Sequence, residues 1–278
     1  MFEEKLIPLE RWITTFVEWL VDNHREFFQL IKWPVEQTLS GFDTGLNAIP
    51  PVIVILFLAI CAWRFSGWGL AVFTLVAMTF IGFLGFWEDT MTTLAMVLAS
   101  VLFCTIVGVP FGIATGRNDR FEKILRPFLD AMQTTPSFVY LVPIVMLFSV
   151  GNVAGVLATI IFAMPPIIRL TSLGIRQVHP ELVEAALAFG ATRTQVLLKV
   201  QIPLALPTIL AGLNQTIMMA LAMVVIASLI GAGGLGSPVI LGLNTLDIGL
   251  AVVAGLSIVL LAMVLDRITQ SMAGKKYE

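Results

Sequence analysis

Charged residues are scarce in this chain. Asp, Glu, Lys and Arg make up 12% of its 278 residues, whereas an average soluble protein contains about 25%. The hydrophobic fraction is 58%, and the mean hydropathy is +0.96. Because so few charges cannot cover the surface of a water-soluble body of this size, the composition predicts an integral membrane protein.

The signals of several functional classes are also missing. The net charge of −2 excludes electrostatic attraction to nucleic acid. Two cysteines, Cys61 and Cys104, and two histidines, His24 and His179, form no spaced ligand set for a metal. The sequence has no acid–base pair, no nucleophile beside a base, and no loop of the pattern G-x-x-x-x-G-K-[ST]. We therefore expect neither an enzyme nor a nucleotide, cofactor or metal site in this chain.

Long apolar runs predict an all-α membrane domain over residues 50–278. About 20 apolar residues are needed to cross a bilayer as a helix. By this criterion the chain has seven spans, with six or eight as the margin, and the first span is short. The expected spans are 50–66, 68–87, 90–115, 128–150, 152–172, 204–230 and 249–266.

Basic residues gather on alternate loops and so predict an orientation. The loops after the first, third, fifth and seventh expected spans carry 12 of the 16 Lys and Arg residues, and the opposite loops carry none. Because loops rich in Lys and Arg stay in the cytoplasm, we expect a cytoplasmic C-terminus and an N-terminus outside. The 12 residues are Arg64, Arg117, Arg120, Lys123, Arg126, Arg169, Arg176, Arg193, Lys199, Arg267, Lys275 and Lys276.

Residues 1–49 form an acidic tail that we expect on the outer side. Its start has no basic segment followed by an apolar one, so we expect no cleavable signal peptide. Two amphipathic stretches, the second ending before Pro34, are typical of helices that lie on a membrane surface. A docking site for an extracytoplasmic partner is the less favoured alternative. The apolar residues are Trp12, Ile13, Phe16, Val17, Trp19, Leu20, Phe27, Phe28, Ile31 and Trp33.

A polar segment, 174–202, separates the fifth and sixth expected spans. Pro180 suits the first position of a helix, and Gly190 suits its end, because glycine adopts the left-handed conformation easily. Thr192 and Gln195 predict a capping box for a second helix. The segment either packs on its own bundle or fits a groove on a partner protein, and these residues alone leave both open.

This segment resembles the EAA motif of binding-protein-dependent ABC importer permeases. It contains Glu184-Ala185-Ala186, three residues, Gly190, nine residues and Val200-Gln201-Ile202-Pro203. Val200 and Ile202 are conservative departures from the family's ending, Ile-x-Leu-Pro. The resemblance implies a coupling helix that docks into a cleft on a cytoplasmic ATPase subunit. The residues assigned to that contact are Glu181, Glu184, Ala185, Ala186, Phe189, Gly190, Val200, Ile202 and Pro203.

Residues 130–143, 214–216 and 224–236 are similar to the glycine betaine and proline betaine permeases. The resemblance implies the transmembrane domain of a type I ABC importer in a bacterial inner membrane. It also implies a second copy of this permease, two copies of an ATPase that binds ATP-Mg, and an external substrate-binding protein. Methionine, taurine and choline permeases share the EAA pattern, so choline or an amino acid is the alternative cargo.

Polar residues inside expected spans are costly in lipid unless they face a partner or a cavity. Helix–helix hydrogen bonding is the favoured explanation for them, and lining of the translocation path is the alternative. Asp130 and Arg169 lie near the cytoplasmic ends of their spans, and their pairing is open. The candidate path residues are Gln133, Thr134, Thr135, Pro136, Asn214, Gln215 and Thr216.

Residues 231–236 formally match the pattern G-x-G-x-x-G. A dinucleotide site needs a strand before this turn and an acid about 20 residues later, but here an apolar span precedes it and the nearest acid is Asp247. We expect a flexible or re-entrant external loop that helps to close the pathway.

A secondary transporter or channel is the rival class. It predicts inverted repeats and charges in the middle of spans for ion coupling, and the expected spans carry no such charges. A purely structural scaffold would leave the EAA-like segment unexplained.

Overall fold

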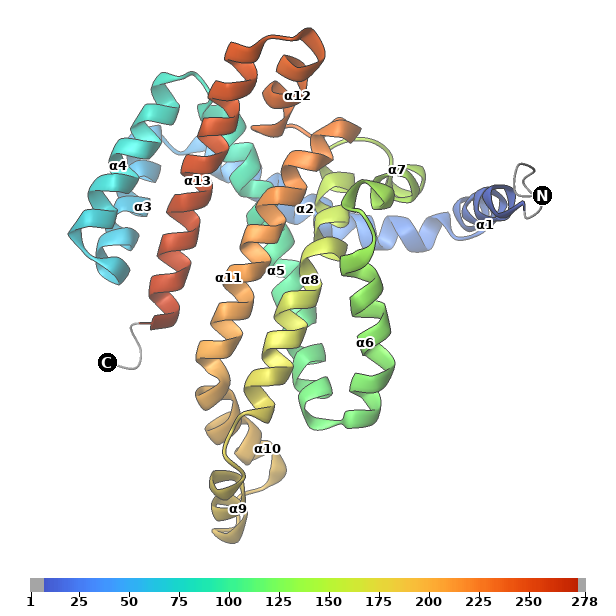
Figure 1. The fold of residues 1–278 in the computed structure, drawn as a ribbon, viewed down its shortest axis with the longest axis vertical. Coiled ribbons are helices and arrows are strands. Elements are labelled where there is room, and N and C mark those ends of the chain that lie inside the picture. The colour runs from blue at the N-terminus through green and yellow to red at the C-terminus, as the bar shows by residue number, and fades with distance from the viewer. Residues whose placement is uncertain (1–7, 275–278) are drawn as a thin grey trace, which may run out of the picture.

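The computed structural model describes residues 8–274 (Figure 1). Residues 1–7 of the expected tail, and Lys275 and Lys276 of the basic C-terminal loop, lie outside the described residues. Within the described part, every regular element is helical, in agreement with the all-α prediction.

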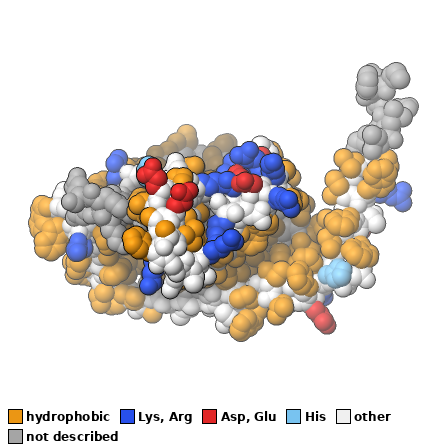
Figure 2. Space-filling model, turned by 90° about the horizontal axis from the view of Figure 1, so that it is seen from below, with side chains coloured by type: hydrophobic (Ala, Val, Ile, Leu, Met, Phe, Trp, Pro, Cys, Tyr) orange, Lys and Arg blue, Asp and Glu red, His pale blue; other side chains and the backbone are white. Residues whose placement is uncertain are grey.

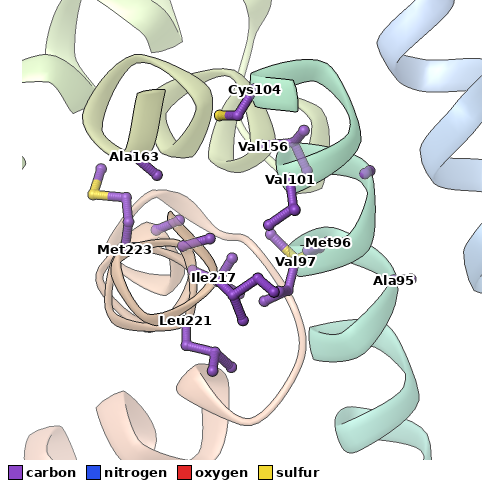
Figure 3. Packing of buried hydrophobic residues seen from close by; sticks show 14 of the residues in the cluster. Ala95, Met96, Val97, Val101, Cys104, Val156, Ala163, Ile217, Leu221 and Met223 are labelled. Atoms are coloured by element: carbon purple, nitrogen blue, oxygen red, sulfur yellow. The ribbon is translucent and has the colours of Figure 1, made fainter. Parts of the chain in front are cut away.

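Three long helices form the centre of the bundle: α5 (Trp87–Arg117), α8 (Asn152–Arg176) and α11 (Ile202–Ala227). Small residues let their backbones approach closely, as is common between membrane helices. A Cβ placed on Gly174 of α8 would lie 3.1 Å from the Cβ of Ala205 on α11. Figure 3 shows the buried side chains that fill this centre. They include Ala95, Met96, Val97, Val101, Cys104, Val156, Ala163, Ile217, Leu221 and Met223.

Further helices flank this three-helix body. One side carries α3 (Pro51–Ser66), α4 (Trp68–Phe83) and α13 (Ile248–Gly274), and the other carries α6 (Asp119–Thr134), η1 (Ser137–Tyr140) and α7 (Leu141–Phe148). At the upper end in Figure 1, η3 (Ser228–Ile230) leads to α12 (Gly236–Thr245). At the lower end lie α9 (Pro180–Ala188), α10 (Arg193–Val196) and a π-helical turn, η2 (Leu197–Gln201).

Each of the seven expected spans contains an apolar helix, but the helices differ in how completely they could cross a membrane. Four described helices are long and apolar enough, and the number rises to six if two bent pairs each count as one span. The six lie at the lower margin of the expected range. The remaining segment is α4, a shorter apolar helix that equals α3 in length at 16 residues, and it must also cross if the termini lie on opposite sides as expected.

The expected span over 128–150 is broken at Pro136, one of the two prolines that invite a break in it. The chain bends by 103° between α6 and the segment Ser137–Phe148. The cause is Pro136, because proline disfavours helical geometry at the residue before it. Thr135 accordingly has an extended ψ of 128°.

The N-terminal tail forms α1 (Leu9–Asn23) and α2 (Arg25–Ala48). Both expected helices of the tail are therefore present, and α2 continues through Pro34 beyond the second apolar set. Proline inside a helix costs about 3 kcal/mol, and burial of Val35 and Leu39 against the bundle offsets that cost. The α1 helix projects sideways from the bundle in Figure 1, so the two halves of the tail differ in their packing.

Candidate coupling and transport sites

The α9 helix has the boundaries that its sequence predicts. Pro180 occupies its first position, and Gly190 follows its end with a φ of +83°. The amide of Gly190 donates to the carbonyl of Leu187 at 2.9 Å, and the amide of Ala191 donates to that of Ala186 at 3.0 Å. This pair of bonds is a Schellman motif, which needs a left-handed residue at the position of Gly190.

The turn after α9 is closed by a capping box. Thr192 Oγ1 accepts from the amide of Gln195 at 3.3 Å, and the Gln195 side chain accepts from the amide of Thr192 at 2.8 Å. The predicted second helix therefore begins at Arg193. It passes through η2 into α11, so α9 lies directly between two central helices along the chain.

The surface of α9 is apolar at its end and open to contact. Phe189 is 94% exposed, and Leu182 and Leu187 are 46% and 45% exposed. Figure 2, viewed from this end, shows acidic and basic side chains around the projecting helix. Of the predicted coupling residues, Glu181, Glu184, Ala185, Phe189, Gly190 and Pro203 are exposed, whereas Ala186, Val200 and Ile202 are half-buried.

The first group of candidate path residues lies at the break between α6 and η1. Gln133 approaches the sulfur of Met219 on α11 at 4.0 Å. Thr134 and Thr135 donate to carbonyls within α6, at 2.9 and 2.8 Å. Pro136 forms the break itself, so the group occupies the junction of the two half-helices.

The second group of candidate path residues lies on α11, and one of its members bonds to another helix. Asn214 donates to Asp266 of α13 at 3.0 Å and accepts from Thr269. Gln215 is exposed, and the buried hydroxyl of Thr216 has no hydrogen-bond partner among the described residues. Asn214 thus joins two helices, which is the alternative that the sequence favoured.

An ion-pair network joins α6 to α8. Arg169 binds Asp130 at 2.5 Å, so the pairing that the sequence left open is formed. Arg176 binds Asp119 at 2.7 Å and Glu122 at 3.0 Å. This second pairing was not predicted from the sequence, although Asp119 and Glu122, three positions apart on one helix face, are a signal for it.

A cavity of about 470 Å³ lies beside this network, between α5, α6 and α8. It lies toward the end of the bundle that carries α9. Its walls combine apolar side chains with charged side chains of both signs. They are Thr115, Glu122, Leu125, Arg126, Leu129, Asp130, Ile168, Arg169, Leu170, Ser172, Leu173 and Arg176.

The turn at residues 231–236 lies at the end of the bundle opposite α9, where hydrogen bonds to α5 and α8 hold it. The amide of Gly233 donates to Asn152 of α8 at 2.6 Å, and the amide of Leu235 donates to Thr93 of α5 at 2.8 Å. Gly234 has a φ of +82°, and a Cβ on it would lie 2.5 Å from Thr93 Oγ1. Neighbouring helices therefore hold this turn, which argues against the flexible alternative and leaves the re-entrant loop as a prediction. A helix, η3, precedes it where a dinucleotide site requires a strand.

Comparison with known proteins agrees with this arrangement. Residues 108–275 match the family model for the binding-protein-dependent transport system inner membrane component. The chain is 55% identical over 270 residues to the glycine betaine/proline betaine transport system permease protein ProW of Escherichia coli (strain K12), covering 97% of this chain and 76% of that protein. It is 48% identical over 270 residues to the glycine betaine transport system permease protein OpuAB of Bacillus subtilis (strain 168), covering 97% and 96%.

A solved structure shares the fold. The chain is similar to an inward facing conformation of the MetNI methionine ABC transporter, with a TM-score of 0.54 and 26% identity. The match covers 63% of this chain and 87% of that chain. The shared region therefore includes most of the solved chain.

Proposed function

Because this chain belongs to the family of binding-protein-dependent transport system inner membrane components, we propose that it is the permease subunit of an importer for glycine betaine and proline betaine. Its fold is that of the transmembrane domain of a type I ABC importer. The observation that supports this choice of substrate is the 55% identity, over nearly the whole chain, to a glycine betaine/proline betaine permease. The Bacillus subtilis relative, also named for glycine betaine, supports the same class.

The proposed assembly contains two copies of this chain, two ATPase subunits in the cytoplasm, and one external substrate-binding protein. ATP-Mg binds and is hydrolysed on the ATPase subunits. The exposed apolar end of α9 supports this arrangement, since Phe189 at 94% exposure offers an anchor for a cleft on a partner. We place the α9 end and the C-terminus in the cytoplasm of a bacterial cell and the N-terminus outside, as the basic loops predict.

Transport follows from movement of α9. When the ATPase subunits bind ATP and close, they displace α9, and the capped turn at Thr192 carries the displacement into α11. The pathway then changes from inward-facing to outward-facing and receives substrate from the binding protein. Shifting such an equilibrium from 1:99 to 99:1 requires about 5.5 kcal/mol, which binding of ATP at two subunits supplies.

Uptake by a reconstituted importer tests this proposal. Vesicles that hold this chain and its ATPase, with the binding protein on the opposite side, should accumulate labelled glycine betaine only when ATP is present with the ATPase. Omitting this chain should abolish accumulation. Uptake of choline or an amino acid in place of glycine betaine would overturn the substrate assignment, and accumulation without ATP would overturn the importer.

A further inference from the structure

The cavity between α5, α6 and α8 has the size of a ligand site. Its volume of about 470 Å³ lies within the range of roughly 300–1,000 Å³ that small-molecule pockets occupy. Such pockets are mostly apolar with a few polar groups that fix the orientation of the ligand. Here Leu125, Leu129 and Leu173 supply apolar wall, and the charged groups lie among them.

Two charged residues of the wall, Arg169 and Asp130, have donor and acceptor positions without a partner among the described residues. Arg176 is the more fully engaged arginine, because both of its terminal nitrogens have partners in Asp119, Glu122 and the carbonyl of Thr115. Among the described residues, Arg169 pairs with Asp130 alone, through one nitrogen and one oxygen. A guanidinium carries five N–H donors, and a carboxylate has about four lone-pair sites. This pair can therefore bind a second partner at each of its members.

Ser172 adds an independent observation. Its side chain lines the cavity, its residue is 7% exposed, and its hydroxyl has no hydrogen-bond partner among the described residues. Ser172 follows Arg169 by three positions on α8, so both side chains lie on the same helix face. Leaving a buried hydroxyl unpaired costs about 1–3 kcal/mol, and rotation of this hydroxyl toward a ligand oxygen in the cavity would remove that cost.

We propose that this cavity binds a small zwitterion that carries a carboxylate and a methylated ammonium. The carboxylate binds the free N–H groups of Arg169 and the hydroxyl of Ser172. The ammonium lies near the carboxylates of Asp130 and Glu122, and its methyl groups pack on the leucines. The inference rests on the proposed function and adds a substrate site within the permease itself, separate from the binding protein.

The arrangement of charge favours a zwitterion over a simple ion. Arg126, Arg169 and Arg176 line the cavity together with Glu122 and Asp130. A lone cation would meet three guanidinium groups, and a lone anion would meet two carboxylates. A molecule with both charges meets an opposite charge at each end.

Saturation-transfer NMR on the assembled permease and ATPase tests the site directly. The complex is placed in nanodiscs of phosphatidylglycerol without the binding protein, and glycine betaine is the probe. We expect transfer to its methyl protons and a dissociation constant that rises about fivefold in Ser172→Ala, since one hydrogen bond is lost. Arg169→Gln and Asp130→Asn should each raise it at least tenfold. Arg120→Gln, an exposed residue outside the cavity, is the matched control and should change nothing.

The outcomes separate this site from the importer assignment. If the unaltered complex imports glycine betaine with its binding protein but shows no transfer signal, the site is wrong and the importer stands. A signal that Ser172→Ala and Arg169→Gln leave unchanged would also overturn the site. Ser172→Ala replaces one small side chain, so it keeps the test valid if Arg169→Gln fails to fold.

A zwitterionic lipid head group is the other source of the same chemistry. Replacing part of the phosphatidylglycerol with phosphatidylcholine distinguishes the two. A signal that persists supports the free solute as occupant. A signal that the phosphatidylcholine abolishes would assign the cavity to a head group and overturn the proposal. A mutation-sensitive signal in a complex that imports nothing would support the site and overturn the proposed function.

Discussion

Gly112 of α5 lies directly against Thr171 of α8. A Cβ on Gly112 would overlap the Cβ of Thr171 and would lie 2.8 Å from the carbonyl oxygen of Ile168. The backbone of α5 therefore contacts a side chain of α8 at this point. The two helices can approach this closely because Gly112 has no side chain.

Gly112→Ala should destabilise the protein. The added methyl group forces α5 and α8 apart, and overpacking of this kind costs about 1–3 kcal/mol. Thermal unfolding of the purified chain in detergent measures the effect. Gly45→Ala in α2 is the control, because no atom lies within 4 Å of its added Cβ. An unchanged unfolding temperature for Gly112→Ala would show that the helices tolerate separation.

Phe189→Ala should weaken attachment of the ATPase. Truncation of an apolar anchor at an interface costs about 2 kcal/mol, or roughly thirtyfold in affinity. The measurement is the amount of ATPase that co-purifies as its concentration is lowered. Phe83→Ala removes an exposed phenyl ring at the end of α4 (87% exposed), far from α9, and it should leave attachment unchanged. Equal losses in both variants would contradict the coupling assignment of α9.

Asp266→Ala should loosen α13 from α11. The change removes the acceptor that the half-buried Asn214 amide uses at 3.0 Å, and loss of one such hydrogen bond costs about 1 kcal/mol. Arg267→Ala changes the neighbouring exposed residue and should stay within about 0.5 kcal/mol of the unaltered chain. Thermal unfolding compares the two variants, and similar stability would mean that the Asn214–Asp266 bond contributes nothing.

Labelling with an impermeant thiol reagent tests the proposed orientation. Thr44→Cys places an exposed thiol on α2, and Glu181→Cys places one on α9. We expect Thr44→Cys to react in intact cells and Glu181→Cys to react only after lysis. The unaltered chain, with Cys61 and Cys104, supplies the background. The reverse pattern would invert the topology.

Local signals predicted the helices of the segment 174–202. Pro180, Gly190 and the pair Thr192 and Gln195 act within a few residues of themselves, so the sequence contains all that is needed to place α9 and α10. The break at Pro136 also has a local cause, and that proline indicates it in the sequence.

Contacts distant in sequence were not predictable. Asn214 and Asp266 are 52 positions apart, and only the packing of α11 on α13 joins them. Helix α2 continues through Pro34 because Val35 and Leu39 become buried, and that burial depends on the rest of the bundle. The cavity beside Arg169 likewise needs three helices to form its walls.

The pinned turn at residues 231–236 has a mechanical consequence. It joins α5 and α8 to the segment that follows α11, at the end of the bundle opposite α9. If α9 couples to an ATPase as proposed, we expect relative movement of the three central helices to be smallest beside Thr93 and Asn152 and largest at the α9 end.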